Sequence, residues 1–352
     1  MLRLRGMGPL SLARAYAASR RPVPNPTHVF LCVADHFEPE WSGADLKLQR
    51  RRVDRWLKEY PLSIDGCVDS RGRPPQHTFF YPVECYLEEH LDRLAQLVQS
   101  GFGDVEVHLH HDNDHAAALR ECLEEAIDKL HHRHGLLYRD AEGRIRYGFV
   151  HGNWALDNSH PDGRWCGVNN ELTILHETGC YADFTMPAAP HAAQTRTINS
   201  IYYAVDDPQL PKSHDTGIAA ARGADPPESG LLMIQGPLLL TQSRPWHKPR
   251  IENGNVAASQ PLLAGRIDNW LRARVCVTGH RQWQFIKLHT HGAQEKNADV
   301  WLGPHARTFH ESLRAVADQR GFQYFYVTAR EMAVLVRQAE QGLVEPRFDE
   351  DL

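Results

Sequence analysis

The sequence predicts an α/β fold built on a parallel sheet or barrel, and two observations lead to this prediction. Over the first 134 residues, segments with strand character alternate with segments of helical periodicity in the order β-α-β-α-β-α. Such alternation is typical of parallel sheets, because each crossover helix covers a face of the sheet. In addition, acids and imidazoles directly follow several predicted strands, at the edge of α/β folds where active sites collect.

The individual elements are predicted from hydrophobic periodicity and from turn residues between the segments. The predicted strands are 27–34, 77–81, 105–110, 145–150, 180–186, 201–205, 231–240 (broken at a Gly-Pro pair) and 283–291, followed by 321–327. The predicted helices are 46–60, 85–100, 119–130, 169–178, 259–277 and 328–341, the last opened by a capping box at Thr328 and Glu331.

Composition limits the class of protein, its possible partners and the cellular compartment in which it is expected. The chain has 352 residues, of which 42% are hydrophobic and 24% charged, as in an ordinary globular protein. A net charge of -5 gives no basic field for nucleic acid, and no apolar run is long enough to predict a membrane span. Seven scattered cysteines without a C-x-x-C pair favour a reducing compartment, so a cytoplasmic location is expected.

Three segments are expected along the chain. Residues 1–26 are rich in arginine and lack acids, and they are expected to form an amphipathic surface helix or a flexible extension. Residues 27–342 are expected to form one domain, and residues 343–352 a solvated tail.

The densest group of chemically active side chains lies between Val105 and His115, in the sequence V-E-V-H-L-H-H-D-N-D-H. Apolar residues alternate along the strand, so the opposite face carries Glu106, His108 and His110. Imidazoles and carboxylates together suit zinc or another divalent first-row metal. Two pairs four residues apart can reach one ion: His110 with Asp114, which lies on the favoured face, or His111 with His115. The competing interpretation is a solvated, histidine-rich loop without metal.

Three further strand ends carry similar side chains. The first predicted strand ends in Asp35 and His36, although Asp35 could instead cap the following segment. The strand at 145–150 is followed by His151-Gly152-Asn153-Trp154. The strand at 283–291 presents Phe285, Lys287, His289 and His291 on one side, and an imidazole near its end is a candidate general acid.

Other catalytic signatures are missing from the sequence. It contains neither a glycine-rich phosphate loop nor a G-x-S-x-G elbow, so a nucleotide cofactor and a nucleophilic serine are unsupported. A metal hydrolase fits better, because a divalent ion lowers the pKa of bound water to about 7 and polarises a carbonyl.

Taken in chain order, these features resemble the polysaccharide deacetylase family. V-A-D-H at 33–36 resembles the first motif of that family, T-F-F at 78–80 its second-strand signature, and E-V-H-L-H-H-D-N-D at 106–114 its second motif. The segment 171–183 is similar to a helix-Gly-aromatic-Asp passage, and K-L-H-T-H at 287–291 to the final strand. The resemblance covers most of 27–327 and implies a distorted (β/α) barrel of seven or eight strands.

The resemblance also implies roles for single residues. The implied catalytic residues are Asp35 as general base and His289 as general acid. The implied metal ligands are His36, in place of an acid, with His110 and Asp114, or with His111 and His115 in a register shifted by one. The residues expected to bind substrate are His151, Trp154, Asp183, Trp246 and His291. The implied cofactor is a divalent metal, with zinc favoured, and the implied substrate is an acylated sugar or glycan.

One motif departs from the family pattern. The third motif normally supplies an Arg followed by Pro and an aromatic residue, whereas this chain has V-H-G-N-W at 150–154, so that Arg is missing or comes from elsewhere, for example Arg244. The sequence therefore leads to a metal-dependent hydrolase that removes an N- or O-acyl group from a carbohydrate, in bacterial surface polysaccharide metabolism. The first alternative is an inactive barrel that serves as a carbohydrate-binding or assembly module. The second is a metal-dependent phosphoesterase, for which Lys287 would be the only cationic candidate.

Overall fold

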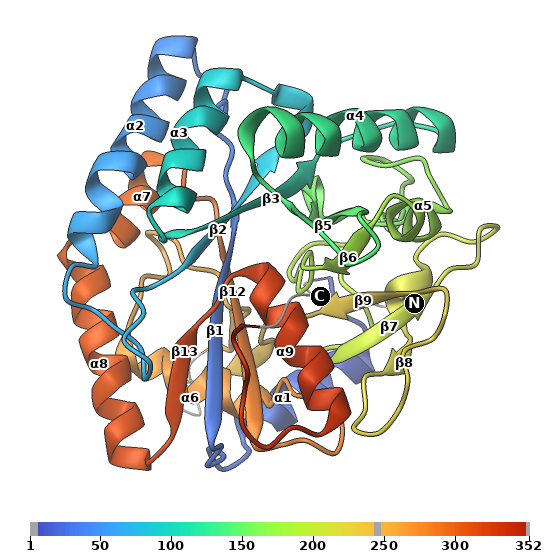
Figure 1. Ribbon diagram of the computed structural model, residues 1–352. Helices are drawn as coiled ribbons and strands as arrows, with labels where there is room; N and C mark the ends of the chain where they lie inside the picture. Colours follow the sequence, from blue (N-terminus) through green and yellow to red (C-terminus); the bar gives the residue numbers. More distant parts are fainter. Residues whose placement is uncertain (1–5, 243–247, 350–352) are drawn as a thin grey trace.

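A large, mostly parallel sheet forms the centre of the protein and is surrounded by helices (Figure 1). The structure is a computed structural model and describes residues 6–242 and 248–349. The strands follow one another in the order β12-β1-β2-β3-β5-β6-β9-β7-β8, with β13 paired to β1 and β4 paired to β5. The predicted mixed α/β class is confirmed, whereas closure of the sheet into a barrel stays a prediction.

The strands of this sheet are β1 (His28–His36), β2 (His77–Pro82), β3 (Gly103–Leu109), β4 (Tyr138–Arg139), β5 (Ile145–His151), β6 (Cys180–Asp183), β7 (Ile201–Val205), β8 (Ile218–Ala219), β9 (Gly230–Ile234), β12 (Trp283–Thr290) and β13 (Gln323–Tyr326). The pairs from β12 through β1, β2, β3, β5 and β6 to β9 are parallel, and β7 runs antiparallel to β9. Parallel strands bring their carboxyl ends to one edge, so the side chains that follow them meet there.

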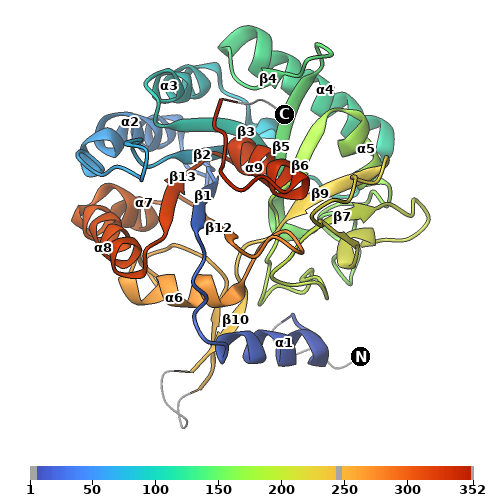
Figure 2. The ribbon, with the colours of Figure 1, turned by 60° about the horizontal axis from the view of Figure 1, so that its bottom comes forward.

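Helices cover the outer face of the sheet: α2 (Leu46–Ser63), α3 (Glu88–Gln99), α4 (Ala116–His134), α5 (Glu171–Glu177), α6 (Ala264–Ala273), α7 (Glu295–Leu302) and α8 (Pro304–Arg320). Alternate strand residues such as Val105, Val107 and Leu109 pack in this outer core. A second core lies on the inner face, where α9 (Ala329–Gln341) packs its apolar residues against the strands. Figure 2 shows the sheet curving around α9.

Several segments differ from the sequence prediction. The sequence prediction does not include helices α7 and α8, whose buried faces mix apolar residues with polar ones such as Asn297 and His310. The predicted helix 259–277 is helical only over Ala264–Ala273. Strand β10 (Leu239–Thr241), at the end of the predicted strand 231–240, pairs with β11 (Arg250–Glu252), for which no strand is predicted.

The two ends of the described chain lie against the rest of the molecule. Helix α1 (Pro9–Ser19) buries Ala15 in a small apolar cluster with Ala189 and Leu238. In the tail, the Phe348 ring lies 4.9 Å from the Phe325 ring. None of the described helices combines the length and the apolar character that a bilayer crossing requires. All seven cysteines carry free thiols.

Candidate metal centres at the carboxyl edge of the sheet

Two groups of potential metal ligands lie close together at the carboxyl ends of the strands. The open cluster consists of His36, Glu38 and His108, and the enclosed cluster of His111, His151, Cys166 and Glu171. Within each cluster, one ligand atom from every member lies within 4.8 Å of those of all the others. Strand β3 contributes to both, because His108 belongs to the strand and His111 follows its end.

In the open cluster, imidazoles surround the Glu38 carboxylate. His108 Nε2 lies 3.2 Å and His110 Nε2 lies 3.4 Å from Glu38 Oε1. The other oxygen, Oε2, is buried and has no hydrogen-bond partner among the described residues, and its nearest imidazole nitrogen, His291 Nδ1, is 3.5 Å away. A buried carboxylate oxygen without a partner is costly, so this atom indicates a place for a cation.

The tautomer of His108 strengthens this conclusion. Its Nδ1 donates a hydrogen bond to the Val150 carbonyl oxygen at 3.0 Å, so in the neutral ring Nε2 presents a lone pair to Glu38. Burial lowers the pKa of His108 and so favours that neutral form. Burial, followed by the neighbouring His291 and His108, also holds the pKa of His36 well below its ordinary value. Two imidazoles and one carboxylate can therefore offer lone pairs to a single cation.

The carboxylates near the cluster are strongly influenced by these imidazoles. Burial alone would raise the pKa of Glu38, but interactions with His108, His110 and His291 hold it well below its ordinary value. Burial opposes a charge on His110, yet Glu38 and Glu84 together raise the pKa of that imidazole to about 10. Glu84 Oε1 lies only 2.6 Å from His110 Nδ1. The Glu84 carboxylate therefore orients His110 with Nε2 facing the open cluster.

The three members of the open cluster are buried, but two imidazoles beside them reach solvent and aromatic side chains line the approach. The side chains of His110 and His291 are 31% and 20% exposed. The ring of Trp154 lies 5.8 Å from those of both His36 and His291, and Trp41, which is exposed, lies 6.2 Å from His291. Two further aromatic side chains continue from Trp154: His191, whose ring lies 5.6 Å from that of Trp154, and Trp165, stacked 5.4 Å from His191. We call Trp41, Trp154, His191 and Trp165 the aromatic row.

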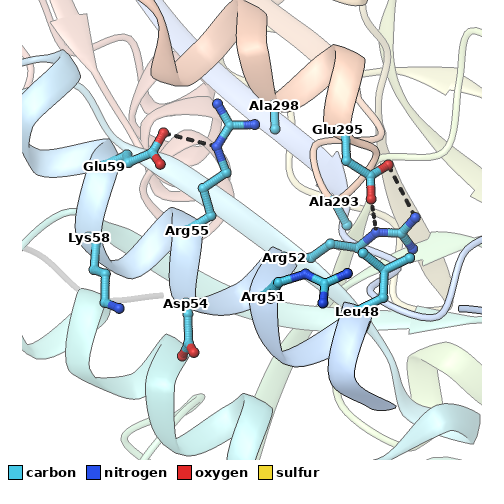
Figure 3. A pocket seen from close by; sticks show the side chains of 10 residues that line it. All are labelled: Leu48, Arg51, Arg52, Asp54, Arg55, Lys58, Glu59, Ala293, Glu295 and Ala298. Atoms are coloured by element: carbon cyan, nitrogen blue, oxygen red, sulfur yellow. Dashed lines mark hydrogen bonds and ion pairs between the residues drawn. The ribbon is translucent and has the colours of Figure 1, made fainter. Parts of the chain in front are cut away.

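Arg52 of α2 fixes the loop that carries Glu38. Its buried guanidinium donates to the carbonyl oxygens of Pro39 at 2.7 Å and Trp41 at 3.0 Å, and it pairs with Glu295 of α7. Figure 3 shows this pair in a hollow between α2 and α7. The other cation drawn with a partner there, Arg55, is paired with Glu59 and also with Asp299. The pair of Arg52 with Glu295 therefore joins α2 to α7 and holds the loop that carries Glu38.

Asp35 lies on the side of β1 opposite to His36, since successive strand residues point to opposite faces. Its carboxylate accepts a hydrogen bond from the Gly292 backbone N–H at 2.6 Å, and its other oxygen lies 2.8 Å from His77 Nε2. Asp35 is fully buried and belongs to neither cluster. The structure therefore does not bring the predicted general base together with the predicted ligand beside it.

The predicted pair His110 and Asp114 is divided between the two clusters. His110 stands at the edge of the open cluster, whereas Asp114 Oδ2 lies 3.0 Å from Nδ1 of His111 in the enclosed cluster. In the alternative register, His111 belongs to the enclosed cluster, but His115 caps α4, because its Nδ1 accepts from the Ala118 N–H. The turn after β3 directs successive imidazoles to different sites, which spacing alone could not reveal.

The remaining predicted residues have different surroundings. His289 shares the inner face with His36, with 6.4 Å between the ring centroids, and burial lowers its pKa well below the ordinary value. The Asp183 carboxylate accepts a hydrogen bond from the Thr185 hydroxyl, and burial raises the pKa of Asp183 to about 7. The Lys287 ammonium donates to the Phe184 carbonyl oxygen at 2.6 Å. Trp246 and Arg244 lie outside the described residues.

The sequence interpretation missed Glu38 among the open cluster's ligands. The available signal was an acid two positions after His36, in the segment D-H-F-E-P at a strand end. His108 lies on the predicted face of β3, but neither of the two pairs that the spacing favours includes it. Cys166 and Glu171 gave no such signal, because they lie outside the predicted strand ends.

Comparison with known proteins adds little to this geometry. No family model and no curated protein matches the chain. Among solved structures, it is similar to one from Mycobacterium smegmatis described as a "putative polysaccharide deacetylase". The identity is 13%, the TM-score is 0.48, and the similarity covers 94% of this chain and 99% of that one. At these values the similarity establishes neither family nor activity.

Proposed function

We propose that the protein is a metal-dependent hydrolase that removes an acyl group from a carbohydrate, with the open cluster as its active site. The observation that carries the proposal is the buried, unpartnered Oε2 atom of Glu38 among imidazoles. Because both His110 and His291 are partly exposed, a substrate can reach this position from solvent.

The donor set fits a catalytic divalent cation. Two imidazoles and one carboxylate, here His36, His108 and Glu38, are a known ligand set of catalytic zinc, in which a fourth position stays free. The Val150 carbonyl oxygen that holds His108 Nδ1 is the kind of outer contact that orients a ligating imidazole. The chemistry that such a cation supplies when bound is a water of lowered pKa and a polarised acyl carbonyl.

His110 and Glu84 form the proton-transfer pair of this proposal. Glu84 holds Nδ1 of His110, and Nε2 faces the open cluster 3.4 Å from Glu38. Because the raised pKa of His110 leaves Nε2 protonated near neutral pH, this atom can donate its proton to the leaving nitrogen or oxygen of the sugar and then regain a proton from the acid product. Asp35 is assigned a positioning role, since it fixes Gly292, the residue after His291.

The aromatic row supports a carbohydrate as substrate. Flat aromatic side chains provide broad apolar contact surfaces with few polar groups, which suits the apolar faces of sugar rings. The indole Nε1 of Trp154 is also buried without a partner among the described residues, so it is free to donate to a substrate oxygen. A phosphoesterase is less well supported, because Lys287 is buried and engaged by Phe184.

Metal analysis and acetate release from acetylated aminosugars test the proposal on the full-length protein. We expect bound divalent metal and turnover in the wild type, and in Glu38→Gln the loss of turnover together with the ion held by the open cluster. The control Glu59→Gln removes a carboxylate that is paired on the outer surface of α2 and should change neither. Bound metal and sugar without acetate release would instead support the carbohydrate-binding module. Turnover that survives Glu38→Gln would exclude the open cluster as the active site.

A further inference from the structure

We propose that the enclosed cluster is a second metal site, which holds a structural zinc ion through His111, His151, Cys166 and Glu171. These residues come from four separate parts of the chain: the turn after β3, the end of β5, the connector 155–170 and the first residue of α5. The set combines imidazole, thiolate and carboxylate, which are the ligand types that zinc binds.

The distances among the ligand atoms suit one tetrahedral ion. His111 Nε2 lies 3.0 Å from His151 Nε2 and 3.3 Å from Glu171 Oε1. His151 Nε2 lies 3.7 Å from the same oxygen. Cys166 Sγ lies 3.4 Å from the other oxygen of Glu171, Oε2, and within 4.8 Å of a ligand atom of each other member. Metal–ligand bonds of about 2.0 to 2.3 Å place tetrahedral ligand atoms roughly 3.3 to 3.8 Å apart.

Hydrogen bonding on the far side of each imidazole leaves lone pairs facing inward. His111 Nδ1 is engaged by the Asp114 carboxylate, and His151 Nδ1 by the Gly152 carbonyl oxygen, so both Nδ1 atoms act as donors. In the neutral rings, both Nε2 atoms are therefore acceptors, and they converge on a third acceptor, Glu171 Oε1. A carboxylate or carbonyl behind each imidazole is also the usual outer shell of metal-bound histidine.

Without a metal, His111 would need a proton on Nε2 in addition to the one that Nδ1 donates to Asp114. That single proton on Nε2 would face two acceptors at once, His151 Nε2 and Glu171 Oε1. It would also leave the thiol of Cys166 beside the same buried carboxylate. A cation at the centre satisfies all four groups together.

The other two ligands are also held in place. The backbone N–H groups of Asn158 and Val168 point to Cys166 Sγ at 3.2 and 3.4 Å. Burial and the Glu171 carboxylate raise the pKa of this thiol when no cation is present, and these two N–H groups oppose that shift. The Asp157 N–H donates to Glu171 Oε2 at 2.5 Å and so turns Oε1 toward the imidazoles. Binding of zinc would displace the thiol proton to solvent, because the thiolate is the ligand.

Burial assigns the site a structural role. His151, Cys166 and Glu171 are 0% exposed, and the side chain of His111 is only 7% exposed. Zinc sites with four protein ligands and no open position are structural. The ion would join α5 and the connector 155–170 to the sheet, and this connector has little regular structure and carries Trp165 of the aromatic row.

The full-length protein, refolded or expressed with zinc, tests the site by metal content. We expect about two zinc ions per chain in the wild type, since the four ligands of the enclosed cluster include none from the open one. Cys166→Ser should retain about one ion, and so should Glu38→Gln, through loss of a different ion. Cys122→Ser removes a thiol outside both clusters and should retain both ions.

A spectroscopic measurement on the wild type makes the result independent of how the variants fold. X-ray absorption at the zinc edge should show a sulfur neighbour at about 2.3 Å, and this sulfur contribution should grow when only Glu38 is changed. Cobalt substitution should give a thiolate-to-metal absorption band that Cys166→Ser removes and Glu38→Gln retains. Zinc that shows no sulfur neighbour, or a wild type that binds only the ion lost in Glu38→Gln, would overturn the proposal. Failure of the proposed hydrolase activity would leave these readouts unchanged.

Discussion

The open and enclosed clusters are neighbours built from similar ligands, yet they differ in access. Both take an imidazole from the end of β3, both contain a carboxylate, and both lie at the carboxyl edge of the sheet. The members of both clusters are largely buried, but the imidazoles of His110 and His291 beside the open cluster reach solvent, whereas His151 and Glu171 of the enclosed cluster have no exposed surface. The comparison teaches that accessibility, more than ligand identity, separates a site suited to chemistry from one suited to structural support.

Treatment with a chelator should reveal the largest difference between the clusters, which is the rate at which each one releases its ion. We expect a strong chelator to empty the open cluster quickly and to lower deacetylation by about a thousandfold, as expected when the main electrostatic stabilisation is removed. The enclosed cluster should release its ion only when the connector opens, which makes release slow. Parallel measurement of turnover and bound metal over time checks this, and simultaneous loss of both ions would contradict the distinction.

Glu171→Gln should affect folding more than any comparable change in the open cluster. Loss of the carboxylate weakens the proposed metal site, and we expect the free energy of unfolding to fall by about 3 kcal/mol or more. Urea denaturation measures this change. The matched control is Glu177→Gln at the other end of α5, where an exposed pair with Arg120 contributes at most about 1 kcal/mol. Equal stability of the two variants would argue against a structural ion.

Glu84→Gln should reduce turnover while metal stays bound. The amide cannot hold His110 Nδ1–H as strongly as the carboxylate does, so we expect kcat to fall about ten- to a hundredfold with little change in KM. Because a carboxylate raises the pKa of an adjacent imidazole, the pH profile of kcat should shift to lower pH as well. Glu88→Gln on α3, whose carboxylate pairs with Arg133, serves as control. An unchanged pH profile would remove His110 from the proton-transfer role.

His310 provides a smaller test, because it is a buried imidazole outside both clusters. Burial lowers its pKa to about 3, and its Nδ1 lies 2.7 Å from the Tyr326 hydroxyl. Between pH 3 and pH 6.5 the unfolded chain therefore binds a proton at His310 that the folded chain does not bind. The contribution of the neutral His310 to the free energy of unfolding is complete above pH 6.5 and is lost as the pH falls toward 3.

His310→Gln keeps an acceptor for Tyr326 but cannot titrate in this range. We expect it to remove one proton from the pH dependence of unfolding, a slope of up to about 1.4 kcal/mol per pH unit. Unfolding measured between pH 4 and pH 7 checks the change, with the exposed His305 on the same helix as control. If His305→Gln altered the slope as much, burial would not be the cause.

Much of the fold was predictable, because periodicity determines which face a strand residue occupies. The alternation in β3 correctly placed Val105 and Val107 in the outer core and His108 on the inner face. The same alternation places Asp35 and His36 on opposite faces of β1, and their catalytic and metal-binding roles stay predictions. Those roles come from the resemblance of V-A-D-H to a two-acid motif.

The sequence by itself determined the parallel α/β order, the strand ends rich in imidazole and the face of each strand residue, because these depend on local periodicity. Only the tertiary structure decided how the imidazoles are grouped. Cys166 comes from a connector without periodicity, and the turn after β3 sends His110 and His111 to different neighbours. Metal ligands are selected by distances of a few ångströms between segments remote in the chain, and such distances exist only after the chain has folded.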